Sequence, residues 1–312
     1  MDNIPEHRIL KFKPNTLEEV RRMHSLDKKR MAESVEVLEN WIKKQDHLMK
    51  KDFSREYLER TIITCKGSVE RAKQQIDKMC TLRTLLPNFF TKLDLQTDLK
   101  AVTEKALLLP LPKMTKNFER IFIVKLNVKD LLPSDIIDYF RLSMVMVECL
   151  KAHDYVNGFI VINDYREVNL MDVMTKMNLS ELQQFMTILI EGYGARLLGL
   201  YIITTSKVVD LFIKTLKQFI KPKVASRLHA ISSVEDIYAI VDKTILPIDY
   251  GGEEKPVNEL IHDWLEELGS EEHQDYMRMM SAAGTDESRR KLDKFNEEYL
   301  GMAGTFRTIN VD

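Results

Sequence analysis

The segment from residue 199 to residue 252 shows the clearest separation of apolar and charged positions in the chain. Between Lys207 and Lys221, apolar side chains recur at steps of three and four residues, while lysines fill the opposite side. This spacing predicts a helix with one apolar face and one basic face. Such a helix can cover an apolar cavity from outside or lie on an anionic membrane surface, and the same residues can do both in turn.

The apolar positions before residue 92 have helical spacing throughout. We expect helices from Asn15 to Trp41 (as one helix or two), at 54–63, and from Ser68 to Pro87, because proline disfavours helical geometry in the residue before it. The side chain of Asn15 is expected to cap the first helix. Three or so helices without a strand predict a small amino-terminal bundle.

Beyond residue 95 the pattern changes to short apolar runs that alternate with helical segments. Strands are predicted at 106–109, 121–126, 159–162 and 198–203, and helices at 134–151 and 179–191. Strands separated by helices of this length imply βαβ crossovers and a mixed, largely parallel sheet, so the fold class is α/β. A last helix, with Pro256 in its first turn, is expected to dock through Trp264 and to stop at Gly269.

Composition narrows the class of protein. The 312 residues are 44% apolar and 30% charged, which is typical of a globular chain, and no run resembles a signal peptide or a membrane span. Cys65, Cys80 and Cys149 form an unpatterned set, so we expect reduced thiols in a cytosolic protein. Residues 1–90 carry 19 basic and 14 acidic side chains, whereas 253–312 carry 7 and 15, and this acidic end argues against a nucleic-acid partner.

Motifs of catalysis and metal binding are absent from the sequence. The glycines at 192, 194 and 199 lead from a helix into a strand, which is the wrong order for a dinucleotide-binding loop. The seven histidines show no metal-ligand spacing, so no metal, cofactor or catalytic residue is predicted. Asp164 and Arg166 flank a strand end, where an ion pair or turn and a ligand role remain open alternatives.

Four stretches carry a resemblance to a known family. The segment 69–90 resembles the end of the amino-terminal helical domain of CRAL-TRIO lipid carriers. The run 157–164, Asn-Gly-Phe-Ile-Val-Ile-Asn-Asp, is similar to one of the family's central strands, and 221–229 and 246–252 (Leu-Pro-Ile-Asp-Tyr-Gly-Gly) resemble its closing motifs. The resemblance covers residues 30–270 and is closest to the branch of the α-tocopherol transfer protein and the retinaldehyde-binding protein.

The resemblance implies an amino-terminal helical domain (1–92), a lipid-binding domain (93–270) whose sheet is the floor of an apolar pocket, and an acidic carboxyl-terminal extension (271–312). It makes the helix at 207–220 a lid over that pocket. Arg196, Lys223 and Arg227 match a cluster that binds phosphoinositide head groups. The matching pocket wall consists of Phe140, Ser143, Met144, Val147, Phe185, Ile188, Leu189, Tyr193, Leu197, Leu200, Val208, Val209, Phe212 and Leu216.

The sequence departs from the family pattern in two places. Thr204-Thr205-Ser206 stands where the family has Asn-x-Pro, at the expected lid hinge, and the turn at 62–67 lacks the family's arginine. The function that the resemblance implies is that of a monomeric cytoplasmic carrier, peripheral at membranes, which transfers a tocopherol, retinoid or other isoprenoid-like lipid and releases it at anionic phosphoinositide-containing surfaces. The alternatives are a lipid-sensing interaction module and a lipid-metabolising enzyme.

Overall fold

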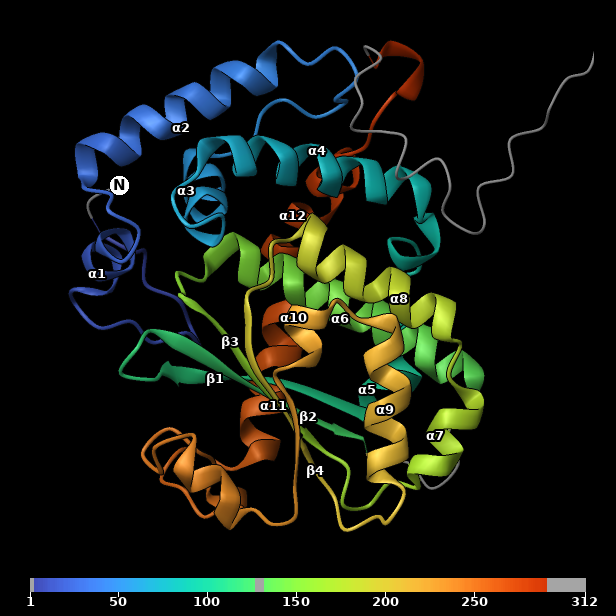
Figure 1. Ribbon diagram of the computed structural model, residues 1–312. Coiled ribbons are helices and arrows are strands. Elements are labelled where there is room, and N and C mark those ends of the chain that lie inside the picture. Colours follow the sequence, from blue (N-terminus) through green and yellow to red (C-terminus); the bar gives the residue numbers. More distant parts are fainter. Residues whose placement is uncertain (1–2, 127–131, 291–312) are drawn as a thin grey trace, which may run out of the picture.

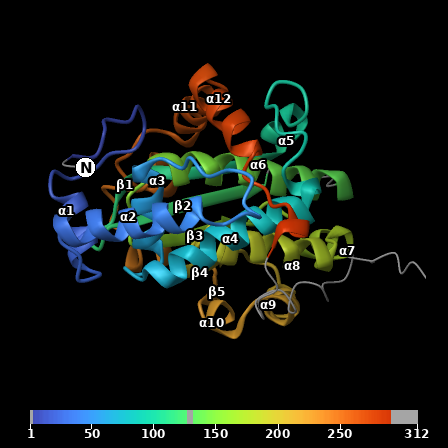
Figure 2. The same cartoon turned by 90° about the horizontal axis from the view of Figure 1, so that it is seen from above.

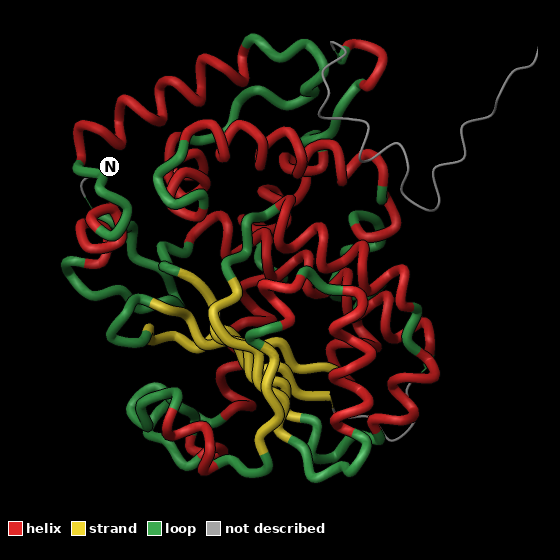
Figure 3. Tube along the Cα trace, viewed as in Figure 1, coloured by secondary structure: helices red, strands yellow, loops and turns green. Residues whose placement is uncertain are grey.

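The computed structural model describes residues 3–126 and 132–290, and it has the predicted α/β class (Figure 1). Helices gather around a single twisted sheet near the middle of the molecule (Figure 3). No helix within the described ranges combines the length and apolar character needed to cross a membrane.

The amino-terminal region is helical, as predicted. Its helices are α1 (Thr16–Arg22), α2 (Lys28–Lys43), α3 (Arg55–Thr64) and α4 (Val69–Leu85), followed by a short 3₁₀ turn, η1 (Pro87–Phe89). Asp27, Ser54 and Ser68 cap α2, α3 and α4 by accepting a backbone N–H three residues on. The expected cap at Asn15 was wrong, because its side chain forms no capping hydrogen bond.

The sheet is mixed and largely parallel, as predicted. Its strands lie in the order β1 (Ala106–Met114), β2 (Glu119–Leu126), β3 (Gly158–Asp164), β4 (Leu197–Ile203) and β5 (Leu228–Ile231). Only the β1–β2 pair is antiparallel. Strand β1 continues past the predicted residue 109 through Pro110 and Pro112, which is possible because β1 is an edge strand and these positions need not donate a hydrogen bond.

Alternate residues of the central strands serve opposite faces of the sheet. Phe122, Val161 and Leu200 line a cavity on one face. Ile121 and Ile160, on the opposite face, belong to a second core. That core contains Trp264 of α11 (Val257–Leu268), whose Nε1 donates to the carbonyl of Pro110 at 2.9 Å, so the predicted docking of this helix through Trp264 is confirmed.

The remaining helices surround the sheet. They are α5 (Lys100–Lys105), α6 (Pro133–His153), α7 (Leu170–Lys176), α8 (Leu179–Thr187) with the π-helical turn η2 (Ile188–Gly192), α9 (Val209–Phe219), α10 (Pro222–Ala225) and α12 (Glu271–Ser281), with 3₁₀ turns η3 (Glu235–Ala239), η4 (Ile248–Tyr250) and η5 (Glu287–Arg289). Figure 2 shows α9 and α10 on one side of the molecule and α5, α11 and α12 on the other.

Helix α9 is shorter than the predicted helix at 207–221. Ile220 has extended dihedrals and Lys221 is non-helical, since Pro222 restricts the residue before it and opens α10. At the other end of the chain, the expected weakly periodic tail begins with the helix α12. The part of the predicted acidic extension at 291–312 lies outside the described residues.

A buried carboxylate connects the amino-terminal helices to the rest of the molecule. Glu148 of α6 has no exposed surface, and it accepts hydrogen bonds from Arg83 of α4, from the hydroxyl of Tyr193 after η2, and from the hydroxyl of Tyr276 of α12 at 3.2 Å. Arg83 also donates to the Tyr193 hydroxyl at 2.9 Å. One side chain therefore holds four segments of the fold in register.

Replacing Glu148 by glutamine should destabilise the fold. The change leaves the guanidinium of Arg83 buried without its countercharge, which costs about 3–5 kcal/mol of unfolding free energy. Urea denaturation followed by tryptophan fluorescence measures this loss, with Glu104→Gln at an exposed position of α5 as the control. Equal stability of the two variants would contradict the role assigned to Glu148.

Candidate functional site

The face of the sheet that carries Phe122, Val161 and Leu200 encloses, together with the helices that cover it, an apolar cavity of about 250 Å³. Strands β1 to β5 all contribute to its floor, and α6, α8, η2 and α9 supply the walls. Phe140 of α6 and Phe185 of α8 stack with ring centroids 4.3 Å apart and join two of these walls. The surface offered to a bound molecule is mostly hydrocarbon.

Helix α9 covers the cavity with one face. Phe212, Leu216 and Ile220 line the cavity at intervals of four residues, and the ring of Phe212 meets Tyr165 edge-on with centroids 6.1 Å apart. Lys214 and Lys217 on the same helix are exposed to solvent. The arrangement in space is that of the predicted lid, with an apolar inner face and a basic outer face.

The structure brings together ten of the fourteen residues predicted for the pocket wall. The ten are Phe140, Ser143, Val147, Phe185, Leu189, Tyr193, Leu197, Leu200, Phe212 and Leu216. Met144 and Ile188 do not line the cavity, because each is directed into the close-packed core and has no exposed surface. Val208 and Val209 lie at the start of α9 and pack, half-buried, against the core beside the cavity. A contact between any of these residues and a ligand stays a prediction.

The segment that precedes α9 is held by hydrogen bonds. The backbone N–H of Thr204 donates to Ile231 at 3.1 Å, and the Thr204 hydroxyl accepts the N–H of Ser206 at 3.2 Å. The Ser206 carbonyl in turn accepts the N–H of Val209 at 3.2 Å. The Thr204 hydroxyl and the Ser206 carbonyl thus hold the turn that leads into α9. This turn lies where the sequence departs from the family's Asn-x-Pro pattern.

A second, basic pocket of about 390 Å³ lies next to the cavity. Seven basic side chains line it, namely Lys66, Arg71, Lys78, Arg196, Lys221, Lys223 and Arg227. The structure therefore brings together the three predicted cations Arg196, Lys223 and Arg227. The pKa of Lys66 is lowered, mainly by the charge of Arg196. The pKa of Arg196 is lowered as well, mainly by burial and then by the charge of Arg227.

The two acidic side chains of the basic pocket are already engaged. Glu191 pairs with Lys78 and Lys221, and Asp77 pairs with Arg290 at 2.8 Å. Among the described residues, no carboxylate pairs with the other five cations. A site that concentrates unpaired positive charge favours an anion.

The cavity and the basic pocket meet at a narrow neck. Thr64, Gly194, Ala195 and Leu197 line both spaces. Gly194 has a φ of +66°, and a Cβ at this position would lie 2.4 Å from Oε1 of Gln75, so only glycine fits there. A lipid bound in the cavity could present its head group at the neck while its apolar part stays on the sheet.

Four basic residues that line the cavity or the basic pocket were not predicted from the sequence. Lys66 and Arg71 enter the basic pocket from the α3–α4 corner, where the family's arginine is missing. Arg60 and Lys151 line the cavity. For Lys151 the sequence did indicate a place in the cavity wall, because this residue continues the four-residue spacing of Ser143 and Val147 along α6.

Asp164 and Arg166 form a fixed ion pair at the end of β3. Arg166 donates to both carboxylate oxygens of Asp164, at 2.8 and 2.7 Å, and Tyr250 of the 246–252 motif donates to Oδ2 at 2.8 Å. Burial would raise the pKa of Asp164, but these hydrogen bonds hold it below its usual value. The ion-pair interpretation is confirmed, and Tyr250 connects the 246–252 motif to this ion pair.

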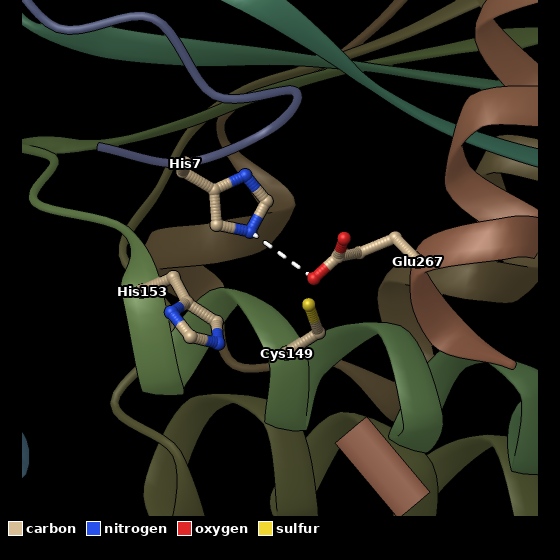
Figure 4. Close-up of side chains that lie close together, drawn as sticks. All are labelled: His7, Cys149, His153 and Glu267. Carbon is tan, nitrogen blue, oxygen red and sulfur yellow. Dashed lines mark ion pairs between the residues drawn. The ribbon is translucent and has the colours of Figure 1, made fainter. Parts of the chain in front are cut away.

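A separate cluster of His7, Cys149, His153 and Glu267 lies on the far side of α6 (Figure 4). Its possible ligand atoms lie within 4.8 Å of one another, although no sequence spacing connects the three segments that supply them. Nδ1 of His7 accepts the backbone N–H groups of Ile9 and Leu10 at 3.1 Å each, which places the proton of the neutral ring on Nε2, 3.5 Å from Glu267. A protonated Nε2 cannot ligate a metal, so the geometry disfavours a metal site, and the two hydrogen bonds at Nδ1 hold the amino-terminal turn around His7.

Comparisons with known proteins agree with this architecture. Residues 104–252 match the model of the CRAL/TRIO domain, and residues 27–99 match that of the Pinta-like, UBA domain. A comparison with curated protein sequences finds no match. Among solved structures, the crystal structure of Sfh5 aligns with 81% of this chain and 93% of its own at 12% identity, with a TM-score of 0.48, a similarity too weak to carry an argument.

The chain therefore contains a CRAL/TRIO domain, which supplies the whole lining of the apolar cavity except Arg60 and Thr64 of α3. CRAL/TRIO domains are generally domains of lipid binding and transfer rather than enzymes. The resemblance to CRAL-TRIO carriers is thereby confirmed at the level of the domain, while the closer likeness to the tocopherol and retinaldehyde carriers stays a prediction.

Filling the cavity should abolish binding of an apolar molecule. Leu200→Trp places an indole over the floor of the cavity, so the affinity for the fluorescent apolar probe N-phenyl-1-naphthylamine should fall at least about tenfold, or about 1.4 kcal/mol. The matched control is Leu211→Trp on the outer face of α9, where Leu211 is 48% exposed. Equal probe affinity in the two variants would show that the probe binds elsewhere.

The buried histidine of the cluster should make stability depend on pH. Burial, followed by the charge of His153, lowers the pKa of His7 from 6.5 to about 4. Between these values the unfolded chain binds the proton more readily, so the stabilising contribution of neutral His7 is present above pH 6.5 and is lost as the pH falls towards 4. His7→Asn, which keeps an acceptor for the two backbone N–H groups, should reduce the slope of unfolding free energy in this window by up to about 1 kcal/mol per pH unit.

The exposed His262 provides the control for this experiment. Its side chain is 71% exposed, and His262→Asn should leave the slope as in the parent protein. Urea denaturation at several pH values gives the slopes. An unchanged slope in His7→Asn would contradict a buried neutral His7.

Proposed function

We propose that the protein is a carrier that binds one small lipophilic molecule in the cavity and transfers it between membranes. The observation that carries the proposal is an apolar cavity under an amphipathic helix, next to a pocket with five cations that have no carboxylate partner in the part of the chain that the structure describes. A lipid can bury its apolar part on the sheet, which contributes about 25 cal/mol per Å² of apolar surface removed from water. The basic pocket then faces the anionic groups of a membrane.

The membrane is the proposed release signal. In solution Phe212 and Leu216 close the cavity, so opening exposes apolar surface to water at a cost. At an anionic bilayer each cation near the surface contributes about 1 kcal/mol, and the inner face of α9 can turn into the interface instead of into water. Lys66, Arg196, Lys223 and Arg227 are the cations proposed to contact phosphoinositide phosphates.

The proposed mechanism requires no covalent chemistry. The two aliphatic hydroxyls in the cavity lining donate to backbone carbonyls: Ser143 to Tyr139 at 2.8 Å and Thr64 to Thr61 at 3.0 Å. Neither hydroxyl is hydrogen-bonded to a histidine or carboxylate that could activate it as a nucleophile. We therefore propose a binding protein, and production of a modified lipid by the purified protein would overturn this.

The proposed division of the chain follows the same lines. Residues 1–92 form the helical domain and residues 93–270 the lipid-binding domain. The described part of the proposed extension 271–312 packs back on the helical domain, since the backbone N–H of Thr285 donates to the Thr84 hydroxyl at 2.8 Å, and Arg290 donates to Asp77 at 2.8 Å. Tocopherols, retinoids and other isoprenoid-like lipids remain the proposed ligand range, with a cytoplasmic monomer as the proposed form.

Removing charge from the rim of the basic pocket should slow transfer. Lys66 and Lys223 are exposed and hold no ion pair among the described residues, so Lys66→Ala with Lys223→Ala removes charge without disturbing the fold. We expect the rate of delivery of a bound fluorescent lipid to phosphoinositide-containing vesicles to fall about thirtyfold, because two cations each contribute about 1 kcal/mol and about 1.4 kcal/mol is tenfold. Delivery to neutral vesicles should be unchanged.

The matched control removes two exposed lysines that lie outside the basic pocket. Lys100→Ala with Lys116→Ala makes the same change in net charge, and Lys100 belongs to α5, on the opposite side of the molecule from α10 (Figure 2). If both double variants lose the same rate, total charge rather than the basic pocket governs delivery. If neither loses rate, the proposed release mechanism is wrong.

A further inference from the structure

One basic side chain of the cavity makes no hydrogen bond within residues 3–126 and 132–290. Lys151, near the carboxyl end of α6, lines the cavity with only 7% of its surface exposed. Its Nζ is fully buried and has no hydrogen-bond partner among the described residues. It is the only cavity-lining residue in the described ranges with such an atom.

The groups around Lys151 do not neutralise it. Its Nζ lies 5.3 Å from the centre of the Tyr57 ring; burial lowers its pKa, and the Cys65 thiol opposes this while Arg60 adds to it. The two acidic side chains close to it along α6 are fully engaged, because Asp154 binds Arg120 through both oxygens at 2.9 and 2.6 Å, and Glu148 binds Arg83 and two tyrosines. An ammonium in this position is desolvated without a countercharge.

Arg60 places a second cation beside Lys151. Its Nε donates to the Lys151 carbonyl at 2.7 Å, and its guanidinium lies 5.0 Å from the centre of the Tyr155 ring. Arg60 is 6% exposed and also lines the cavity, and no carboxylate among the described residues pairs with it. The end of the cavity near Thr64 and Gly194 therefore carries two buried cations and an apolar floor.

Two buried cations with no acidic partner are costly unless the ligand supplies the negative charge. We propose that the cavity binds a lipid with a carboxylate head group, which pairs with Lys151 beside Arg60 while its hydrocarbon chain lies on the sheet. The cavity volume of about 250 Å³ suits a lipid with a single hydrocarbon or isoprenoid chain rather than a phospholipid with two chains. This inference rests on the proposed carrier function and specifies the chemical class of its ligand.

The titration of Lys151 provides a signature of the ion pair. Burial lowers the pKa of Lys151 to about 7, so the side chain is mostly neutral at pH 8 before the ligand arrives. Pairing with a carboxylate favours the ammonium, and binding at pH 8 should therefore take up a proton from solvent. Below pH 7 the ammonium is already present, and the uptake should diminish.

The test compares cis-parinaric acid with its methyl ester, which has the same chain without the charge. The wild-type protein should bind the acid at least about tenfold more tightly than the ester at pH 7, as expected for one charge-assisted hydrogen bond to a buried ammonium. Lys151→Met should bind the two probes within about twofold of each other, with the affinity for the ester unchanged. Calorimetry at pH 8 in two buffers with different ionisation enthalpies should show proton uptake for the acid alone.

Each other outcome identifies what is wrong. Equal affinity of the wild-type protein for acid and ester overturns the carboxylate assignment and leaves the carrier proposal standing. Binding of neither probe overturns the carrier proposal itself. If Lys151→Met still binds the ester and still prefers the acid, Lys151 is excluded as the partner of the carboxylate. If Lys151→Met fails to bind the ester, the same comparison of acid and ester in Lys151→Gln, together with the proton uptake of the wild-type protein, shows whether Lys151 is the partner.

Discussion

The carboxylate of Glu148 is the interaction on which the rest of the structure depends. It is fully buried, and it joins α4, α6, α12 and the residue that follows η2. Because Tyr193 both binds Glu148 and lines the cavity, the position of the cavity wall is tied to the position of the helical domain. Gly194, the next residue, forms the neck, so the same contact sets where cavity and basic pocket meet.

The basic pocket follows from that arrangement. Lys66 and Arg71 come from the helical domain, whereas Arg196, Lys223 and Arg227 come from the sheet domain. The proposed phosphate-binding surface takes residues from both regions and requires them to be held together, and the network around Glu148 does so. The proposed lid α9 lies on the side of the molecule shown with α10 in Figure 2, opposite α12.

Much of the fold could be predicted from the spacing of apolar residues. The apolar run 159–162 predicts a strand, and the structure confirms it as part of β3, with Ile160 in one core and Val161 over the cavity. Helix boundaries were predictable where a local signal exists, as at Pro87, and the end of α9 was missed because the effect of Pro222 on Lys221 was not considered. The cap at Asn15 failed because a capping residue type does not ensure a capping geometry.

The polar part of the candidate site was less predictable. Lys151 and Arg60 are 91 residues apart and meet only in the folded chain. His7 and Glu267 likewise have no spacing that connects them. Burial of a charge is a property of the tertiary structure, so the four-residue spacing that places Lys151 on the same side of α6 as Ser143 and Val147 does not reveal that its amine is buried without a hydrogen-bond partner among the described residues.

The central claim is that the CRAL/TRIO domain holds one lipid molecule in the cavity under α9. Native mass spectrometry of the purified protein after incubation with a total lipid extract tests it most directly. The account predicts a complex with a single lipid molecule per chain, formed by the parent protein and lost in Leu200→Trp. A protein that shows no lipid adduct, or an adduct that persists unchanged when the cavity is filled, would contradict it.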